Sequence, residues 1–406
     1  MPNSFHYLLL GAGRQGTAAA YDLARFGEAA SLTLADADIA RAQAAADRIT
    51  QLTGFTAIRA IALDVNDGDA VADALRGQNV ALSAVPYYFN LPLTQAAIVA
   101  GVSFCDLGGN TDIVRAQHAL DADARAAGVA IVPDCGMGPG MGNTLAVYAM
   151  ELLDNPQHVR IYDAGLPQAP EPPWNYLATF NIEGLINEYH DGMTVLREGE
   201  LVHLPCFTEL ETIHVPGVGH LEAFVLAGGV STAPWTFQNR LASYDLKVCR
   251  YPGTFAQLKA FSDLGLFSPQ PVDVRGSAIR PRDLFQVLFE PQVRQPVMRD
   301  VCLIRAVARG THTSRTAQAR VDLVDHYDEA TGFTSMERTT GWHLAIVAAM
   351  LARGEIAPGA APLEIAVPAA TFVAHARRRG FQIIETVEVA DPSTLSVSDQ
   401  FSISNS

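Results

Sequence analysis

The first part of the chain, up to about residue 145, alternates short apolar runs with alanine-rich stretches of helical length. Such alternation is typical of βαβ units, in which right-handed helical crossovers join parallel strands. We therefore predict an α/β fold with a doubly wound parallel sheet. The predicted strands are 6–10, 30–35, 56–63, 80–85, 103–106 and 130–133, and the predicted helices are 16–26, 39–52, 67–75, 91–100 and 116–127.

The pattern changes after Asn143. One helix is predicted over 144–153, and a proline-rich irregular segment follows it. Strands such as 158–163, 209–214 and 320–325 then alternate with loops, which indicates an α+β region with a more antiparallel sheet. Helices return at 338–353 and 368–379, before a polar, serine-rich end. The predicted domains are 1–143, 144–337 and a helical segment 338–385, followed by a tail over 386–406.

The motif Gly11-Ala12-Gly13-Arg14-Gln15-Gly16 lies between the first predicted strand and the first predicted helix. In this context G-x-G-x-x-G is typical of a dinucleotide-binding turn, as in Rossmann-type domains. The first glycine permits the tight turn, the second lets the backbone approach a pyrophosphate, and the third allows close packing of helix on strand. The N-terminus of the helix then offers N–H groups to the phosphates, so Gly11, Gly13, Arg14, Gln15 and Gly16 are predicted cofactor-binding residues.

Two acids follow later strands of the same predicted sheet. Asp36 stands 20 residues after Gly16, where a carboxylate binds the adenosine ribose and repels a 2′-phosphate. This predicts NAD rather than NADP, although the nearby Arg41 could oppose that preference. Asp64 ends the third strand, where it would either lie near the adenine or cap the strand end.

The carboxyl ends of the fourth, fifth and sixth strands should meet at the nicotinamide end of the cofactor. They carry three groups that can transfer a proton, Tyr87, Asp106 and Asp134. For the two acids, helix capping is an equally good interpretation. The adjoining backbone predicted to contact the cofactor is Ala84, Pro86, Gly108 and Gly109.

Composition narrows the partners and the chemistry. The formal charge is −15, which argues against a nucleic-acid partner, because phosphate binding needs clustered cations. Lys247 and Lys259 are the only lysines, so a catalytic lysine in the first half is excluded. Five scattered cysteines, no secretory leader and no long apolar stretch predict a cytoplasmic protein without a membrane span. No spacing typical of metal ligands is present, and no metal site is predicted.

Several segments, in this order, resemble the saccharopine dehydrogenase-like family over about residues 6–385. They include GAGRQG, LADAD, FCDLGG, PDCGMGPGMGN, AGLPQAPEPPWNY, FNIEGLINEY, GHLEAF, GGVST, CRYPGTF, DLGLF and SMERTTGW. Within the family the chain is most similar to the NAD-dependent lysine 6-dehydrogenase branch. The resemblance implies a Rossmann domain, an inserted substrate-binding and dimerisation domain, a C-terminal segment that packs back on the first, and a homodimer or larger assembly. It also implies that Tyr87, in a Pro-Tyr pair, lies in the active site.

The second half supplies candidate substrate-binding residues. An amino-acid carboxylate needs a cation, for which Arg240, Arg250 and Arg338 are candidates, or else they form structural salt bridges. Glu183 and Glu222 are candidate partners of an ammonium group. Thr232 and Thr339 could bind substrate or cap turns and helices. Asn110 and Thr254 are further candidate substrate-binding residues. Together with Val248, they differ from the residues usual in lysine dehydrogenases, so the identity of the amine substrate stays open.

The function that these observations favour is NAD-dependent oxidation of an amine or amino acid. A base at the strand ends, Tyr87, Asp106 or Asp134, would take a proton from the amine, and hydride would pass to the nicotinamide. Which of the three is the base, the oligomer number and the physiological direction stay open. One alternative is a saccharopine-type or opine-type reductase that joins an amine to an oxo acid. Another is an NAD-binding protein without turnover.

Overall fold

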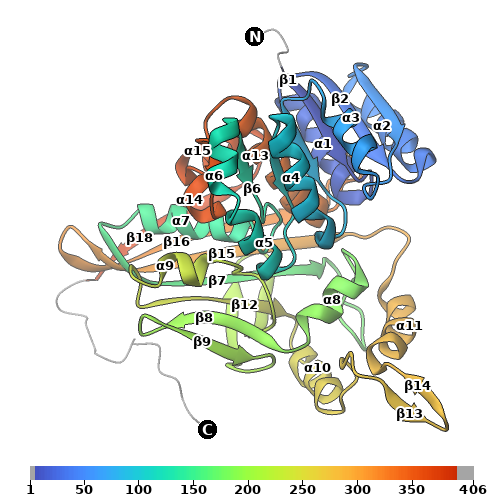
Figure 1. Cartoon of the computed structure of the whole chain (residues 1–406). Helices are drawn as coiled ribbons and strands as arrows, with labels where there is room; N and C mark the ends of the chain where they lie inside the picture. The colour runs from blue at the N-terminus through green and yellow to red at the C-terminus, as the bar shows by residue number, and fades with distance from the viewer. Residues whose placement is uncertain (1–4, 391–406) are drawn as a thin grey trace. The chain divides into compact units, whose positions relative to one another are not determined.

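The computed structural model describes residues 5–390, which form two compact units (Figure 1). The first unit comprises the described residues up to Thr144 together with Ser231–Thr236 and Tyr327–Phe381. The second comprises Leu145–Val230, Phe237–His326 and the described residues from Gln382 onward. The chain thus re-enters the first unit at Tyr327, earlier than the predicted start at 338.

The first unit is built on a parallel sheet, as predicted. Within residues 5–390 the sheet has seven strands in the order β17-β6-β5-β4-β1-β2-β3, the doubly wound order with one strand added at an edge. The bounds are β1 Phe5–Leu10, β2 Ala29–Asp36, β3 Ile58–Ala62, β4 Val80–Ser83, β5 Ser103–Asp106, β6 Ala130–Val132 and β17 Gly359–Ala360. The added strand β17 was not predicted, because two residues carry no periodicity.

Helices follow the strands largely where periodicity placed them. The first group is α1 Arg14–Phe26, α2 Ile39–Thr53, α3 Gly68–Leu75 and α4 Asn90–Ala100, with a 3-10 turn at Tyr87–Phe89. The single helix predicted over 116–127 is wrong: the structure has α5 Thr111–His118 and α6 Asp121–Ala127. Asn110 caps the first of these by accepting a hydrogen bond from the N–H of Ile113.

The C-terminal helices of the first unit begin at a capping box that is formed by Thr334 and Glu337. There follow α12 Ser335–Glu337, a π turn at Arg338–Trp342, α13 His343–Ala352, α14 Leu363–Ala366 and α15 Ala369–Arg378. Residues 343–351 of α13 are all buried, and the helix contacts β4 and β5. Helix α13 is therefore a core element of the first unit.

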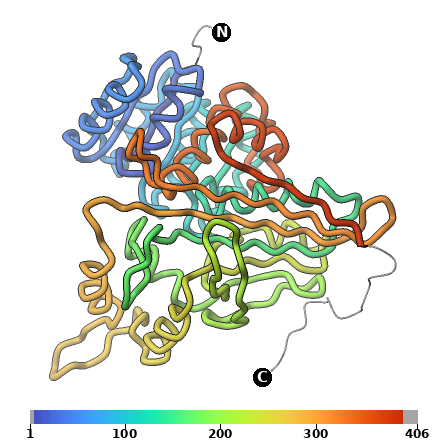
Figure 2. The backbone as a smooth tube through the Cα atoms, turned by 180° about the vertical axis from the view of Figure 1, so that it is seen from behind, coloured from blue at the N-terminus to red at the C-terminus, as the bar shows by residue number. Residues whose placement is uncertain are grey.

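The second unit is built on a mixed sheet, where only β12 and β7 run parallel among the described strands. Its path is β10-β11-β12-β7-β15-β16-β18, and β8 and β9 pair beside β12. Figure 2 shows the long neighbouring strands β15 and β16 with β18 alongside. The bounds are β7 Asn155–Pro167, β8 Gly192–Arg197, β9 Glu200–Pro205, β10 Glu211–Val215, β11 Gly219–Phe224, β12 Ser243–Arg250, β15 Asp300–His312, β16 Arg315–His326 and β18 Ile383–Val389.

Strand β18 corrects the predicted tail, since residues 386–389 belong to the sheet and pair with β16. From residue 391 the predicted tail lies outside the described residues. The remaining elements are α7 Met141–Glu151, α8 Ile182–Glu188, α9 Ala233–Phe237, α10 Thr254–Asp263, the hairpin β13 Val272–Val274 and β14 Ser277–Ile279, and α11 Pro281–Val293. No helix within residues 5–390 has the length and apolar character needed to cross a bilayer.

Candidate functional site

The glycine-rich turn has the geometry that a dinucleotide requires. Gly11 adopts a left-handed φ of +98°, and a Cβ on Gly16 would overlap the carbonyl of Gly11. The space around Gly13 is open, and no side chain caps the start of α1 there. The side-chain oxygen of Gln15 is buried without a hydrogen-bond partner in the described structure. These features fit a pyrophosphate at the N-terminus of α1.

Asp36 lies at the end of β2 with its carboxylate held in place. One oxygen accepts a hydrogen bond from the N–H of Ala12 at 2.9 Å, and the other accepts from the N–H of Asp38 at 2.9 Å. Arg41 is 3.6 Å from the second oxygen and is largely exposed. A carboxylate fixed at this strand end is suited to bind a ribose. The nearby guanidinium of Arg41 would weaken the repulsion of a 2′-phosphate.

Arg14 and Asp64 are engaged in local structure. The guanidinium of Arg14 donates to the carboxylate of Glu337 at 2.7 Å and to the hydroxyl of Thr334 at 3.3 Å. Asp64 is exposed and accepts hydrogen bonds from the backbone and side chain of Asn66, which lower its pKa. This is the strand-end capping that the sequence left as an alternative.

The structure gathers the three strand-end groups around the Gly108–Gly109 loop. A Cβ on Gly109 would lie 3.4 Å from Cβ of Tyr87, and a Cβ on Gly108 would overlap the carboxyl of Asp134. Tyr87 follows β4 directly after Ala84 and Pro86, and it is half-buried. Gly108 therefore has no room for a side chain beside Asp134, whereas at Gly109 it is the φ of +110° that favours glycine.

Asp106 is completely buried and already satisfied. Its carboxylate accepts from the N–H of Gly108 at 2.7 Å and from the side-chain amide of Gln117 at 2.7 Å. Burial raises the pKa of Asp106 to about 6 although these hydrogen bonds favour the charged form. The arrangement suits a residue that braces the loop.

Asp134 differs from Asp106 in its hydrogen bonding. Its φ of 65° is unusual for a residue other than glycine, and its Oδ1 is buried with no partner among residues 5–390. Burial raises the pKa of Asp134 to about 8, reinforced by the negative charges of Asp106 and Glu364, although the hydroxyl of Ser231 favours the charged form. A carboxyl that titrates near neutral pH and retains a free lone pair suits proton transfer.

The segment Ser231–Thr236 completes this part of the first unit. Ser231 has a φ of 43°, and its buried hydroxyl interacts with the carboxyl of Asp134, whose charged form it favours. Thr232 and Thr236 donate to the carboxylate of Glu364 at 3.2 and 2.6 Å, and burial raises the pKa of that glutamate. The hydroxyl of Thr232 thus binds Glu364, and that of Ser231 faces Asp134.

The second unit holds a buried group that we call the Arg250 cluster: Asp163, Tyr176, Glu188, Tyr189 and Arg250. The guanidinium of Arg250 lies 3.6 Å from the carboxylate of Glu188 and 5.3 Å from the ring centre of Tyr176, and its Nε has no partner in the described structure. Burial raises the pKa of Asp163 to about 6 and that of Glu188 to about 7. The carboxyl groups of Asp163 and Glu188 thus share one cation, the guanidinium of Arg250.

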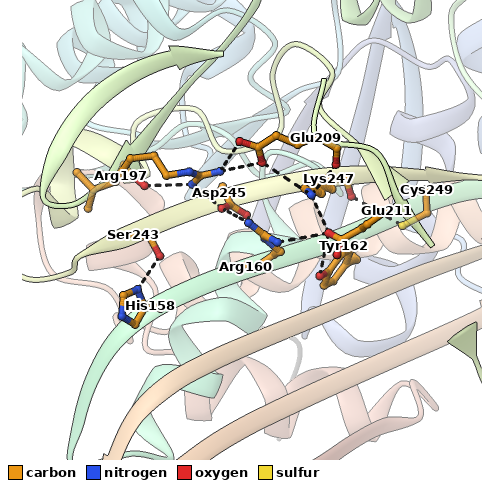
Figure 3. A network of polar contacts seen from close by, with 11 residues as sticks. His158, Arg160, Tyr162, Arg197, Glu209, Glu211, Ser243, Asp245, Lys247 and Cys249 are labelled. Carbon is orange, nitrogen blue, oxygen red and sulfur yellow. Dashed lines mark hydrogen bonds and ion pairs between the residues drawn. The ribbon is translucent and has the colours of Figure 1, made fainter. Parts of the chain in front are cut away.

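Figure 3 shows a second, partly buried set in the same unit, which we call the paired network. It consists of Arg160, Tyr162, Arg197, Glu209, Glu211, Asp245 and Lys247. Arg160 donates two hydrogen bonds, of 2.6 and 2.9 Å, to the carboxylate of Asp245. Arg197 forms an ion pair with the same carboxylate, and Lys247 forms one with Glu211 at 2.8 Å. Burial alone would raise the pKa of Asp245, but these cations hold it below its ordinary value.

Other predicted substrate-binding residues are engaged elsewhere. Glu183 and Arg240 are exposed. Glu222 caps α10 by accepting from the N–H groups of Gly253 and Phe255, each at 2.9 Å. Thr254 is buried at the start of α10, and its hydroxyl has no described partner.

Arg338 and Thr339 belong to the first unit. Arg338 lies 3.6 Å from Asp328 and packs over Trp342, and the fully buried Thr339 donates to the carbonyl of Ser335. These contacts favour structural roles for both residues.

Sequence reasoning missed Asp163, Glu188, Tyr189 and Ser231 as candidates. Glu188 and Tyr189 belong to the quoted segment FNIEGLINEY, from which Glu183 was chosen instead. Residues 182, 185 and 186 of α8 are buried, so the buried face of that helix was the available signal, and Glu183 lies off it.

Comparison with known proteins accounts for nearly the whole described chain. Residues 7–132 match the family model "Saccharopine dehydrogenase NADP binding domain", and residues 136–376 match "Saccharopine dehydrogenase C-terminal domain".

Among curated proteins, the NADP-dependent, L-glutamate-forming saccharopine dehydrogenase of Schizosaccharomyces pombe is 27% identical over 169 residues. The match covers 40% of this chain and 36% of that protein, so it spans about a third of the relative's length. The apo L-glutamate-forming saccharopine dehydrogenase of Saccharomyces cerevisiae superposes with a TM-score of 0.76 at 18% identity, over 95% of this chain and 100% of that one. This likeness establishes the shared fold.

Proposed function

This chain belongs to the saccharopine dehydrogenase family of NAD(P)-dependent oxidoreductases, and on that premise we propose that it oxidises an amine-bearing carbon with NAD as acceptor. We propose L-lysine as the substrate, oxidised at its side-chain amine to allysine, which cyclises to 1-piperideine-6-carboxylate. The observation that carries the proposal is the buried, incompletely hydrogen-bonded carboxyl of Asp134, whose pKa burial raises to about 8.

Asp134 is assigned the proton transfer. A lysine-type ammonium has a pKa near about 10.4 and must lose a proton before its carbon can release hydride. A bound nicotinamide would supply the hydride acceptor. The carboxylate of Asp134 takes the proton and releases it to solvent, and the regenerated carboxylate then helps water to add to the resulting iminium. The balance is ammonium substrate, NAD and water giving aldehyde, ammonium ion, NADH and one proton.

Arg250 is assigned the substrate carboxylate. A guanidinium binds a carboxylate through two parallel hydrogen bonds, and Arg250 retains an unpartnered Nε. Glu188 and Asp163 are the nearest acids, and they offer partners for an α-ammonium group. The predicted ammonium partners Glu183 and Glu222 have weaker support, since one is exposed and the other caps α10.

A substrate screen with three single variants tests the proposal. NADH formation is measured with L-lysine, other amino acids and diamines, for the parent and for Asp134→Asn, Asp106→Asn and Tyr87→Phe. We expect Asp134→Asn to lower kcat by about 10²–10⁴-fold, because a positioned base contributes that much. Tryptophan quenching by NADH checks that each variant still binds cofactor. If Asp134→Asn stays within threefold of the parent, Asp134 is not the base.

Cofactor choice is tested separately. Asp36 should favour NAD, since its fixed carboxylate would repel a 2′-phosphate. We expect a higher kcat/KM with NAD than with NADP, and a smaller ratio in Asp36→Ala. Arg41→Ala is the matched variant, and it should widen the ratio by removing the nearby cation. A parent enzyme that prefers NADP would overturn the assignment.

A saccharopine-type reductase is the second candidate, favoured by the similarity to L-glutamate-forming saccharopine dehydrogenases. It would consume NAD(P)H only when an amine and an oxo acid are both present, whereas the proposed reaction needs one amine alone. A protein that binds NADH but shows neither reaction would instead be a cofactor-binding protein without turnover.

A further inference from the structure

The two-residue strand β17 brings a third carboxyl to the candidate site of the first unit. Strand β17 pairs in parallel with β6, and β6 pairs in parallel with β5 on its other side. Asp106 ends β5, Asp134 closely follows β6, and Glu364 closely follows β17. Because the carboxyl ends of parallel strands meet at one edge of a sheet, the strand order places Asp134 between the other two carboxyls.

Glu364 anchors the segment Ser231–Thr236, which belongs to the first unit although its neighbours in the chain belong to the second. The hydroxyls of Thr232 and Thr236 both donate to the same oxygen of Glu364. The two threonines are four residues apart, and the N–H of Thr236 donates to the carbonyl of Thr232 as in a helical turn. Both hydroxyls therefore lie on one face of the turn. The buried carboxylate thus fixes the segment beside the residues that follow β17.

A second contact holds the same segment. The guanidinium of Arg115 on α5 lies 5.0 Å from the ring centre of Trp235. Helix α5 starts just after the Gly108–Gly109 loop, which Tyr87 and Asp134 approach. The segment is therefore attached to two elements that border the candidate site.

The backbone of Ser231 adopts a conformation that is rare outside glycine. Both Ser231, with a φ of 43°, and Asp134, with a φ of 65°, are left-handed. Such conformations are costly and concentrate at functional sites. Both side chains are buried, and the hydroxyl of Ser231 interacts with the carboxyl of Asp134. The unusual backbone of both residues is thus associated with one contact between their side chains.

This contact opposes two influences that keep Asp134 protonated. Burial raises the pKa of Asp134, and the negative charges of Asp106 and Glu364 add to that effect. The hydroxyl of Ser231 instead favours the carboxylate. The neighbouring thiol of Cys135 is buried, which raises its pKa, so it contributes no charge near neutral pH. Asp134 can accept a proton only as a carboxylate, so a donor that favours this form preserves the base.

We propose that Ser231 is a positioning residue, whose hydroxyl donates a hydrogen bond to the carboxylate of Asp134. Glu364 holds the segment that carries this donor, through Thr232 and Thr236. The proposal rests on the assignment of Asp134 as the base in the proposed function. It gives Glu364 two separable effects, since the same carboxyl anchors the donor and disfavours a charge on Asp134.

The test follows the titration of Asp134 directly, so it needs no substrate. NMR of protein with isotope-labelled aspartate carboxyl carbons gives a curve for each aspartate, and the curve of Asp134 is the one missing from Asp134→Asn. Ser231→Ala removes the hydroxyl, and Ser231→Gly removes it in a residue that tolerates the left-handed backbone. We expect both variants to raise the midpoint of Asp134 by about one pH unit, because the carboxylate loses a donor.

Two further variants separate this effect from a general loosening of the fold. Glu364→Gln keeps an acceptor oxygen for both threonines and removes the negative charge, so the midpoint of Asp134 should fall. Ser83→Ala is the matched control, because the buried hydroxyl of Ser83 donates to the uncharged side chain of Asn90 at 2.8 Å. It should leave the midpoint unchanged. Circular dichroism checks folding, and Ser231→Gly decides the test if Ser231→Ala does not fold.

The pH profile of kcat/KM gives a second readout. Its acidic limb should move upward in Ser231→Ala, with kcat/KM about tenfold lower at neutral pH and near that of the parent above the shifted midpoint. Midpoints within about 0.3 unit of the parent in both Ser231 variants would overturn the proposal, since this is at most a twofold change in proton affinity. An upward shift in Glu364→Gln or Ser83→Ala would overturn it too, by showing that the shifts report loosening.

Failure of the proposed function has a different signature. If Asp134→Asn keeps the parent's kcat, the base assignment is wrong, and Ser231 does not position a base. The NMR midpoints then still show whether Ser231 donates to Asp134. A large loss of kcat in Asp134→Asn with unshifted midpoints in the Ser231 variants leaves the base assignment intact and removes Ser231 alone.

Discussion

Two buried charge clusters lie on opposite faces of one sheet, and they differ in how completely their charges are met. In the β12–β7 pairing, Asp245 aligns with Arg160 and Lys247 with Tyr162, while the alternate residues Asp163 and Arg250 lie on the other face. The first set belongs to the paired network and the second to the Arg250 cluster.

The paired network is balanced. Arg160, Arg197 and Lys247 face Asp245, Glu209 and Glu211, and the low pKa of Asp245 shows that the charged state is favoured there. The Arg250 cluster has one cation for two acids, and both of these have raised pKa values. Two largely buried sets of charges can therefore have different roles: a complete set stabilises the fold, whereas an incomplete set retains capacity for a ligand.

Asp245→Asn should give the largest effect on stability. The substitution leaves Arg160 and Arg197 buried without their shared carboxylate, and breaking such a pair costs about 3–5 kcal/mol. Urea unfolding of the parent and the variant at neutral pH measures the loss. Turnover per folded molecule should stay near that of the parent.

Asp263→Asn is the matched control, because Asp263 forms an exposed pair with Lys259, and we expect a change of about 0.5 kcal/mol or less. If both variants lose the same small amount, the paired network does not stabilise the sheet as described.

Arg250→Met should weaken substrate binding and change stability less, which is the reverse of what we expect for Asp245→Asn. Loss of a charge-assisted hydrogen bond to substrate corresponds to about 1.5–3 kcal/mol, or roughly a 10–100-fold fall in kcat/KM that appears mainly in KM. Stability should fall less than in Asp245→Asn, because Glu188 and Asp163 already have raised pKa values and can take up protons. Steady-state kinetics with the substrate found in the screen measure the effect. An unchanged KM would remove Arg250 from the substrate site.

The smallest expected effect is on the pH dependence of stability. The pKa of Glu188 is about 7 in the folded chain, above its ordinary value of 4.5, so the folded state binds more protons between these values. The stability due to this group is therefore complete at low pH and is lost as pH rises through about 7. Glu188→Gln should flatten that decline.

Asp245, whose pKa is lowered, has the opposite sign: its contribution is lost as pH falls towards that lowered pKa. Thermal melts at several pH values separate the two groups. A decline that is equally steep in Glu188→Gln would assign the titration to another residue.

The first unit could largely be predicted from the sequence because its signals are local. The strand–turn–helix around Gly11 and Gly16 and the order of strands followed from periodicity and glycine placement. The break between α5 and α6 did not follow, because Ala119 and Leu120 are good helix formers. The side chain of Gln117 instead binds Asp106 and Thr94, and such long-range contacts leave no periodic trace.

The candidate site of the second unit could be predicted only in part. Arg250 stood in a recognisable segment, but its acidic neighbours come from β7 and the end of α8, far away in the sequence. Glu183 and Glu188 are the same residue type on one helix, and only their positions around α8 leave Glu183 exposed and Glu188 half-buried. Asp106 and Asp134 could not be told apart from the sequence either. The number of hydrogen bonds that each carboxyl accepts depends on how the loop folds.

The discontinuous make-up of the first unit has a consequence for biosynthesis. Its buried helix α13 and edge strand β17 are translated after the whole of β7 to β16, so the nascent N-terminal sheet lacks the cover that α13 gives β4 and β5 until residue 343 and beyond have been made. Domains generally fold as units when they emerge, and exposed apolar surface in the meantime invites aggregation. A chain terminated before His343 would therefore lack part of the core of its cofactor-binding half, although every residue of the glycine-rich turn would be present.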